Sequence, residues 1–586
     1  MMTKKLALLL FLGCFLALAF QPATRSSEDT LAGEVSPRRP IALSLMEDGK
    51  VLLVANRDRG SVCVVDCLAG KTLAETRVGG KLSDLAVGTH GGIVAATDEE
   101  KGEVILFDYA ERALREKRRI KVGLSPVGVR FREDGKVASI ALLWPRQIAL
   151  VAVSGDNAVR LIDLPFAPRL QVYVPGTAKL IVADSFGAHL AVIDTKTRTI
   201  DRVCAITTVH NIRGLAIDQT GKYVLLAHQR LHASGHPTRG DIQSGNLIDN
   251  EFRKLSIADL LNPLADPLRG DRVHPLGDID RGAGDPAEIA ETKDGKTVVA
   301  FAGVNELAIG YPAKATWTRL NVGKLPTRFA IDAKRNRVYV ANTFGDSISV
   351  VDLADLKVTR TISLSAKPAT LDAVQRGELL FHDATLSFDG WYSCHSCHTD
   401  GHTSGRLNDN LTDGSFGTPK RVLTLLGVKD TAPYAWHGKI ADTPAQIKQS
   451  LTSTMQGPTP TKEQVDDIAA YLMTLAPPPS VTKARGTFDA KKFEQGRAVF
   501  VEKKCANCHK EPTFTSQRTY DVGLRDEAGL TQFNPPSLRG ISQAGPYFHD
   551  GRARNLDEVF SKHRHPGGTD LREEERAALL EFLNAL

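Results

Sequence analysis

Seven copies of a strand-rich repeat, followed by two copies of a helical segment, predict a multidomain fold: an all-β seven-bladed propeller and then two all-α domains. The chain has 586 residues, and a single hydrophobic core rarely grows beyond about 250–300 residues. Hydrophobic residues make up 42% of the sequence and charged residues 24%, as in ordinary folded proteins. Length and composition are therefore those of several packed domains in one chain.

The N-terminus reads "MMTKK" and then "LALLLFLGCFLALAF", a short basic region followed by an apolar run. The run is too short to span a bilayer comfortably and is typical of a secretory leader, for which Ala17-Leu18-Ala19 supplies a cleavage site. Cys14 loosely matches a lipoprotein box, but the apolar run continues past it, so we do not expect lipid anchoring. We expect residues 1–19 to be a signal peptide and the protein to be periplasmic or otherwise exported, with no transmembrane segment.

A four-strand repeat is expected over residues 38–366. The sequence "IALSLMEDGKVLLVANRDRGSVCVVD" at 41–66 returns as "RFAIDAKRNRVYVANTFGDSISVVD" at 328–352. Alternating apolar residues with Gly, Asp and Asn turns indicate hairpins. The "VAN"-type strand recurs about every 40–44 residues, a period typical of propeller blades, near positions 55, 96, 139, 183, 227, 301 and 341. "VYVANTF" at 338–344 resembles the YVTN-type β-propeller family.

One repeat is nearly twice as long as the others because it holds an insertion near residues 229–275. The insertion carries His232, His236 and His274. We expect it to be a surface loop. A lid over a neighbouring cofactor and a docking loop for a partner are the alternatives.

After residue 371 the β pattern stops and helices are expected. The first half should run from a helix at 371–381 to a helix at 461–475, which Thr461 and Gln464 would cap. "APPPS" then opens a linker at 477–488. The second half should run from a helix at 489–500 to the final segment "LREEERAALLEFLNAL". We therefore expect two duplicated all-α domains, at 372–476 and 489–586.

Each half carries a Cys-x-x-Cys-His motif, in "WYSCHSCHTDGH" at 391–402 and in "KKCANCHKE" at 503–511. Two thiols on one helical turn can form thioethers to the two vinyl groups of haem, and the adjacent histidine then reaches the iron. A zinc site needs four ligands around one ion, whereas these motifs lie in separate halves. A redox dithiol is the other alternative. We expect two covalently bound c-type haems, attached through Cys394 and Cys397 with iron ligand His398, and through Cys505 and Cys508 with iron ligand His509.

The helix before each motif has a glycine and a phenylalanine four residues apart: Gly377 and Phe381, then Gly496 and Phe500. This pairing suits the N-terminal helix of small c-type cytochromes. The absence of a side chain on glycine would let the C-terminal helix cross closely.

A matching loop follows in each half: "TPKRVLTLLGVKDTAPYAWHGK" at 418–439 and "NPPSLRGISQAGPYFHDGR" at 534–552. With these loops and the haem motifs, residues 372–586 resemble the di-haem cytochrome c peroxidase and MauG-type family. The resemblance implies that the distal ligand of the second haem, methionine or tyrosine in the family, follows the second loop by about twelve residues. This position holds His563, with His565 and His549 as competitors and a surface histidine as the other interpretation of His563.

For the first haem, Met455 follows His398 at nearly the spacing that separates His563 from His509. We expect Met455 to be the distal iron ligand, with a packing role in the core as the alternative. Methionine would raise the potential of this haem above that of a bis-histidine partner, so electrons would pass from the second haem to the first. His402 is the competing ligand, but it lies too close to His398 in sequence to reach the opposite face of the iron easily.

The resemblance also implies a tryptophan near the haems and a glutamate that moves protons during peroxide cleavage. Trp436, in "WHGK", matches the tryptophan and is the catalytic candidate, with an ordinary buried aromatic as the alternative. Where the family has Glu-Met, this sequence has Thr454-Met455. The missing carboxylate counts against efficient peroxidase activity.

We therefore expect an exported di-haem c-type cytochrome, an oxidoreductase that transfers single electrons, with the propeller as a docking or substrate-recognition surface. A redox protein is the expected donor or acceptor. A peroxidase or MauG-like oxidase acting on peroxide or a protein substrate is one alternative, and a propeller binding module with redox-sensing haems is another. The formal net charge of +6 gives no support for nucleic-acid binding.

Overall fold

The computed structural model describes residues 36–88, 92–207, 209–314, 316–411 and 414–586. The expected signal peptide lies outside this range. Among the described residues, no helix is long and apolar enough to cross a bilayer.

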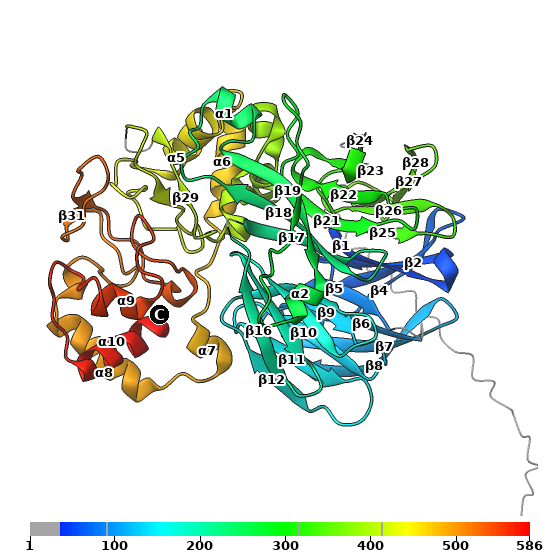
Figure 1. Cartoon of the computed structure of the whole chain (residues 1–586), viewed down its shortest axis with the longest axis horizontal. Helices are drawn as coiled ribbons and strands as arrows, with labels where there is room; N and C mark the ends of the chain where they lie inside the picture. Colours follow the sequence, from blue (N-terminus) through cyan, green and yellow to red (C-terminus); the bar gives the residue numbers. More distant parts are fainter. Residues whose placement is uncertain (1–35, 89–91, 208, 315, 412–413) are drawn as a thin grey trace, which may run out of the picture.

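The strands of the described chain form seven four-stranded antiparallel sheets between Pro40 and Ser363, which confirms the seven-bladed β-propeller (Figure 1). In the first four blades the strands are β1 Pro40–Met46, β2 Val51–Asn56, β3 Ser61–Asp66, β4 Lys71–Arg77, β5 Leu82–Val87, β6 Ile93–Asp98, β7 Glu103–Ala110, β8 Ala113–Lys121, β9 Pro126–Phe131, β10 Val137–Leu142, β11 Gln147–Ala152, β12 Val159–Asp163, β13 Pro168–Tyr173, β14 Lys179–Asp184, β15 His189–Asp194 and β16 Thr199–Ala205. In the last three they are β17 Val209–Ile217, β18 Tyr223–Leu231, β19 Ile248–Ser256, β20 Arg272–Pro275, β21 Pro286–Glu291, β22 Thr297–Phe301, β23 Glu306–Tyr311, β24 Thr316–Asn321, β25 Pro326–Asp332, β26 Arg337–Asn342, β27 Ser347–Asp352 and β28 Lys357–Ser363.

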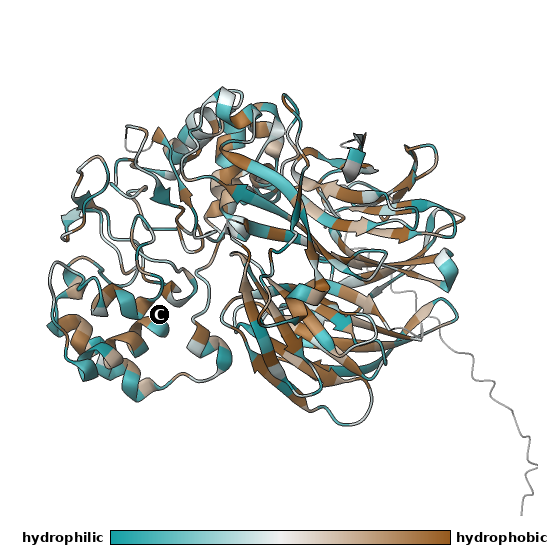
Figure 2. Ribbon diagram, in the orientation of Figure 1, coloured by the Kyte–Doolittle hydropathy of each residue, from teal (hydrophilic) through white to brown (hydrophobic). Residues whose placement is uncertain are grey.

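The first strand of each blade lines the centre of the ring. Each of these inner strands contacts the next one along the chain, and β1 contacts β25, so the ring closes between the first and last blades. Apolar side chains fill the space between neighbouring blades; Leu52 of β2, for example, packs with Ile348 of β27. Figure 2 shows hydrophobic residues concentrated along the blade strands. Cys63, Cys67 and Cys204 are buried free thiols in these layers, as expected of packed cysteines.

The long insertion is more than a surface loop. It contributes β19 and β20 of the fifth blade and two short helices, α1 Arg239–Gln243 and α2 Ile257–Leu261. Ile242 of α1 and the nearby Leu247 are buried in a cluster with Trp391 and Tyr392, which directly precede the first haem motif. The expectation of a simple loop was therefore incomplete, because apolar residues of the insertion form part of the core beside this motif.

The C-terminal region is helical, as expected, with two short hairpins in its loops. The helices are α3 Ala373–Phe381, α4 Cys394–Cys397, α5 Thr443–Gln449, α6 Lys462–Leu472, α7 Val481–Arg485, α8 Ala490–Glu502, α9 Leu556–Ser561 and α10 Glu573–Asn584. The hairpin strands are β29 Leu407–Asn408, β30 Lys420–Arg421, β31 Tyr520–Asp521 and β32 Gln532–Phe533. The expected capping box at Thr461 and Gln464 is present at the start of α6.

The two halves repeat the same helix crossing. A Cβ on Gly377 of α3 would lie 1.9 Å from the carbonyl oxygen of Asp467 in α6. A Cβ on Gly496 of α8 would lie 2.1 Å from the carbonyl oxygen of Ala578 in α10. Both distances are far below van der Waals contact, so each crossing requires glycine. The predicted role of the two glycines is confirmed.

The helical region packs alongside the propeller, with α6 next to β18 and β19 (Figure 1). Arg39, just before β1, forms a bidentate ion pair with Glu378 of α3 at 2.6 and 2.7 Å. Further along, Nε of Arg146 in the propeller donates to the side-chain oxygen of Gln543, in the second half, at 2.9 Å. The propeller therefore contacts both halves of the helical region.

Candidate haem-binding sites

The first Cys-x-x-Cys-His motif forms a one-turn helix, α4, that begins with a reciprocal capping box between Ser393 and Ser396. His398 follows the helix directly. Its Nδ1 hydrogen-bonds the carbonyl oxygen of Leu423 at 2.9 Å, so this nitrogen carries the proton and Nε2 keeps its lone pair. Burial lowers the pKa of His398 to about 4, which keeps the ring neutral. This is the state that an iron ligand requires.

A cavity of about 300 Å³ lies against this motif, and its walls are mostly apolar. The four residues predicted to hold the first haem all line it: Cys394, Cys397, His398 and Met455. The Met455 side chain is only 3% exposed. A c-type haem with histidine and methionine ligands requires two cysteines for attachment, one imidazole and one methionine sulfur. These four groups lie around one apolar cavity here. The residues present therefore fit this group.

His402, the competing ligand, is fully engaged elsewhere. Its Nδ1 hydrogen-bonds the hydroxyl of Thr424 at 2.9 Å, and its Nε2 hydrogen-bonds the carbonyl oxygen of Gln543 at 2.9 Å. The ring packs edge-on against Phe186 of the propeller. His402 thus joins three parts of the molecule and has no ring nitrogen left for iron.

The second motif begins with a single 3₁₀ turn at Cys505–Asn507. Nδ1 of His509 hydrogen-bonds the carbonyl oxygen of Phe514 at 3.1 Å, and burial lowers the pKa of this histidine. This geometry repeats that of His398, because Nδ1 again hydrogen-bonds a backbone carbonyl oxygen. Cys505 and Cys508 are half-buried free thiols. The second motif therefore offers the same donors to a haem as the first.

Three histidines near the second motif have buried ring nitrogens without a hydrogen-bond partner among the described residues: Nε2 of His563, Nδ1 of His565 and both nitrogens of His549. His563 and His565 each pack edge-on against Phe548, with ring centroids 5.5 Å apart. Burial, followed by the nearby His509, lowers the pKa of His565 to about 4. A buried ring nitrogen without a hydrogen-bond partner needs an explanation, and binding to a metal ion supplies one. His563, predicted as the distal ligand, and His565 both meet this condition.

Trp436, the catalytic candidate, is buried between the two halves and lines the cavity. Its Nε1 donates to the carbonyl oxygen of Arg421 at 2.8 Å, and the guanidinium of Arg421 lies 5.5 Å from the ring centroid. Its own carbonyl oxygen accepts from the backbone N–H of Asn534, in the second loop, at 2.8 Å. Its ring also faces His549 edge-on at 6.3 Å. Trp436 is thus a contact between the halves.

No Asp or Glu occurs among the described residues that line the cavity. Thr454, which stands where the resembling family has glutamate, lines it together with Met455. The backbone carbonyl of Thr454 accepts from the hydroxyl of Tyr392 at 2.6 Å. The described cavity wall therefore lacks the carboxylate that would move protons during peroxide cleavage.

No sequence pattern indicated directly that the propeller would contact the first motif. Nε2 of His210 hydrogen-bonds the carbonyl oxygen of Ser396 at 2.9 Å, and the amide of Gln229 donates to its hydroxyl at 3.1 Å. The amide of Asn250 donates to the carbonyl oxygen of Trp391 at 2.9 Å. One signal was present: the fifth repeat reads "AHQ" at 227–229, where the first and seventh repeats have "AN" and the fourth has "AD". Polar residues that break a buried strand pattern can mark such a contact.

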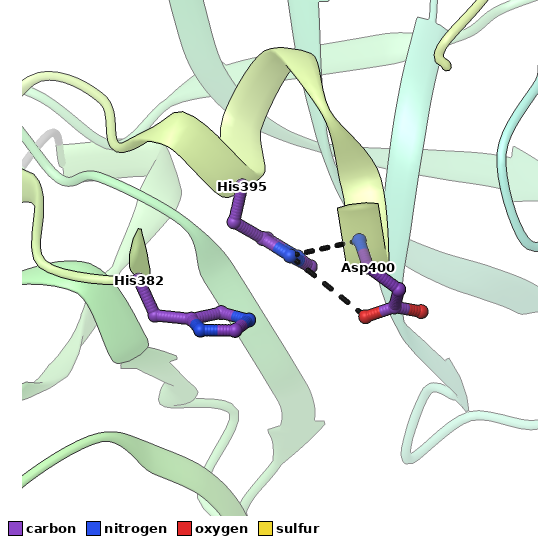
Figure 3. Close-up of side chains that lie close together, drawn as sticks. All are labelled: His382, His395 and Asp400. Carbon is purple, nitrogen blue, oxygen red and sulfur yellow. Dashed lines mark hydrogen bonds and ion pairs between the residues drawn. The ribbon is translucent and has the colours of Figure 1, made fainter. Parts of the chain in front are cut away.

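His395, which lies between the two cysteines of the first motif, forms a cluster with His382 and Asp400 (Figure 3). Figure 3 shows His395 between the other two side chains, with its ring directed at Asp400. Arg169 and Arg213 of the propeller each donate to Oδ2 of Asp400 at 2.8 Å. The charge of the Asp400 carboxylate is already balanced by these two guanidinium groups. The same two groups would repel a metal cation bound at the cluster. We therefore interpret the cluster as part of the contact with the propeller.

These features define a class of protein: a seven-bladed β-propeller followed by a helical region with two Cys-x-x-Cys-His motifs. Residues 372–482 match the family model described as di-haem cytochrome c peroxidase. The resemblance drawn from the sequence is confirmed for residues 372–482, which contain the first haem motif.

Curated relatives agree with the family match. Methylamine utilization protein MauG of Methylorubrum extorquens is 27% identical over 38% of this chain and 80% of its own length. Hydrazine synthase subunit gamma of Kuenenia stuttgartiensis is 25% identical over 37% of this chain and 79% of its own length. Cytochrome c551 peroxidase of Nitrosomonas europaea is 24% identical over 37% of this chain and 81% of its own length. Among solved structures, Kuenenia stuttgartiensis hydrazine synthase aligns with 55% of this chain and 98% of its own, at 19% identity and a TM-score of 0.47.

Proposed function

We propose that this chain is an exported di-haem c-type cytochrome that passes single electrons between haems held at residues 394–398 and 505–509. The observation that carries the proposal is that His398 and Met455 line one cavity whose described walls contain no carboxylate. When bound, haem supplies a one-electron iron couple. A histidine and a methionine on opposite faces would close the iron to small molecules, which suits electron transfer better than peroxide cleavage.

The residues around each site hold the ligands in place. Leu423 and Phe514 accept the Nδ1 protons of His398 and His509, which fixes the ring orientation and the tautomer of each. Trp436 lies buried between the halves, with the guanidinium of Arg421 over its ring. A methionine on the first iron and a histidine on the second would give the first haem the higher potential. Electrons would then pass from the second haem to the first, with a redox protein as donor or acceptor.

We also propose the domain division expected from the sequence: a leader at 1–19, a propeller at 38–366, a first cytochrome domain at 372–476, a linker at 477–488 and a second cytochrome domain at 489–586. Two close helix crossings support the two helical units: Gly377 of α3 packs against α6, and Gly496 of α8 packs against α10. An exported protein would meet the oxidising compartment in which c-type cytochromes mature. N-terminal sequencing of the secreted protein tests the leader, with a first residue near Phe20 as the expected result.

Optical and electron paramagnetic resonance spectra of each redox state, with and without hydrogen peroxide, test the electron-transfer proposal. We expect two low-spin haems whose spectra ignore peroxide. A five-coordinate, high-spin haem at the first site, or one that becomes high-spin after one-electron reduction, would contradict it.

The second candidate function is a peroxidase or a MauG-like oxidase. Two observations favour it: the peroxidases and MauG proteins among the relatives, and Trp436 buried between the halves. In this case Met455 would have to leave the iron, and Trp436 would carry an electron between the sites. Rapid peroxide-dependent oxidation of a reduced donor, lost in Trp436→Phe, would support this second function.

The ligand of the second haem is open to direct test. In the protein with His563→Ala we expect the second haem to lose its low-spin spectrum, because its sixth ligand is gone. His565→Ala is the matched control, since both rings pack on Phe548 at 5.5 Å and only one should bind iron. Low-temperature electron paramagnetic resonance of the ferric protein gives the measurement. The reverse pattern would assign the iron to His565.

A further inference from the structure

The contact between the propeller and the first haem motif centres on one carboxylate, that of Asp285. This residue directly precedes β21 and is 4% exposed. Its two oxygens approach the hydroxyls of Ser393 at 2.5 Å and Ser396 at 2.6 Å. These serines form the capping box of α4, the helix that carries the first two thiols. A propeller residue therefore completes the N-terminus of the haem-attachment helix.

The hydrogen bonds from Ser393 and Ser396 influence whether the carboxyl group of Asp285 is ionised. The hydroxyl oxygen of Ser396 accepts from the backbone N–H of Ser393 at 2.9 Å and from the amide of Gln229 at 3.1 Å. The hydroxyl of Ser393 accepts from the backbone of Ser396 in the capping box. Both hydroxyl protons are therefore directed at Asp285, whose oxygens act only as acceptors. Burial raises the pKa of Asp285, and the two donated hydrogen bonds act against this shift by favouring the ionised carboxylate.

The backbone around Asp285 is held as firmly as its side chain. Gly282 and Gly284 donate backbone hydrogen bonds to the carbonyls of Asp389 and Gly390, at 2.7 and 3.0 Å. A Cβ on Gly282 would lie 2.5 Å from the backbone of Trp391, so only glycine permits this approach. The segment "GAGD" at 282–285 thus packs backbone to backbone against the chain that enters the haem motif.

The second motif has no such partner among the contacts of the described chain, and it serves as an internal comparison. The residue before its first cysteine is Lys504, where the first motif has Ser393, and no capping box forms at this turn. Around the first motif, the charge of Asp285 contributes, after burial, to raising the pKa of Cys394 to about 12, and it acts in the same direction on Cys397. The field of Asp285 therefore reaches both sulfur positions of the first motif.

We propose that Asp285 is a positioning and tuning residue of the first haem: the propeller supplies a buried negative charge that lowers the reduction potential of this haem alone. This inference rests on the proposed function in requiring haem at residues 394–398. A buried anion stabilises the ferric form, which carries one more positive charge than the ferrous form. Asp285 would moderate the rise in potential that Met455 produces. The propeller is thereby part of the redox centre, not only a separate docking module.

Arg169 and Arg213 place two positive charges beside the same motif, since both form ion pairs with Asp400. Their effect on the reduction potential should therefore be opposite to that of Asp285. Removing one of these positive charges should lower the potential of the first haem. Removing the negative charge of Asp285 should therefore raise the potential of the first haem, and removing the positive charge of Arg213 should lower it. A general loosening of the fold would not shift the potential in opposite directions.

The test is an optical redox titration of the full-length, haem-loaded protein with both midpoint potentials resolved. The first haem is identified as the one missing when Cys394 and Cys397 are replaced by serine. In Asp285→Asn we expect its reduced-to-oxidised ratio at a fixed ambient potential to rise about tenfold, equivalent to about 59 mV for one electron, and the second haem to stay unchanged. Asp285→Glu, which keeps the charge, should lie near the wild type.

Asp332→Asn is the matched control. Asp332 is also a buried propeller carboxylate that accepts backbone hydrogen bonds, but its partners are Lys334 and Arg335 at the end of β25 and not residues of the haem motif. It should leave both potentials unchanged. If Asp285→Asn leaves both potentials unchanged or shifts both equally, the inference is wrong.

If Asp285→Asn yields no haem-loaded protein, Arg213→Gln decides the question. A lower potential of the first haem alone supports the inference, and an unchanged one overturns it. The mass of the protein separates this inference from the proposed function. A chain without haem at residues 394–398 contradicts the proposed function. A chain that carries this haem, but whose potential stays unchanged in Asp285→Asn and in Arg213→Gln, contradicts only the role of Asp285.

Discussion

Replacing Gly377 by alanine is expected to destabilise the first helical half by about 3 kcal/mol or more. The added Cβ would lie 1.9 Å from the carbonyl oxygen of Asp467, and this atom belongs to the backbone of α6. Overpacking usually costs about 1–3 kcal/mol, and here the neighbouring side chains cannot relieve the clash by changing rotamer. The two helices must separate, which opens the apolar cluster that contains Phe381. Urea unfolding followed by haem absorbance gives the measurement.

Gly240→Ala is the matched control for this prediction. Gly240 lies in α1, where an added Cβ would meet nothing within 4 Å. Alanine there should be neutral or stabilise by up to about 1 kcal/mol, because it favours helix more than glycine does. Equal unfolding midpoints for Gly377→Ala and Gly240→Ala would show that the close crossing does not contribute to stability.

Met455→Leu is expected to convert the first haem from a low-spin to a high-spin form that reacts with peroxide. Leucine fills nearly the same volume, so the fold should lose less than about 1.5 kcal/mol, but leucine has no sulfur to bind iron. The midpoint potential of this haem should fall on the order of 0.1 V, within the roughly 0.8 V range that axial ligands span. The measurements are the ferric absorption spectrum, which should lose the weak long-wavelength band of methionine ligation, and a redox titration.

Met473→Leu controls for the loss of a methionine. Met473 ends α6 and packs against the same apolar cluster, but it is not among the residues that line the cavity. Its replacement should change neither the spectrum nor the potential. If Met455→Leu is equally silent, Met455 is a packing residue and the iron of the first haem has another ligand or none.

Much of this molecule follows from local sequence patterns. Alternating apolar residues and the repeated "VAN" strand predict the blades, because a propeller blade is built from contacts within about 40 residues. The two motifs and the glycines at 377 and 496 predict the helical region for the same reason: each half reads helix, motif, loop and helix in order. The capping box at Thr461 is likewise a signal within four residues.

The contacts that the sequence could not predict join residues far apart in the chain. Asp285 and Ser393 are separated by 108 positions, and neither lies in a pattern that names the other. The two hydrogen bonds that occupy His402 come from Thr424 and from Gln543 in the second half, so only the fold rules this residue out as an iron ligand. Similarly, α1 of the insertion becomes part of the core because its apolar side meets Trp391.

The central claim is that haem is tethered by thioethers at both Cys-x-x-Cys-His motifs. Mass spectrometry of the denatured mature protein, followed by peptide mapping, tests it most directly. We expect the mass of the polypeptide plus two haems, with one haem on the peptide that contains residues 394–398 and one on the peptide that contains 505–509. A colourless protein with the mass of the bare polypeptide, expressed where c-type haem is attached normally, would contradict the account.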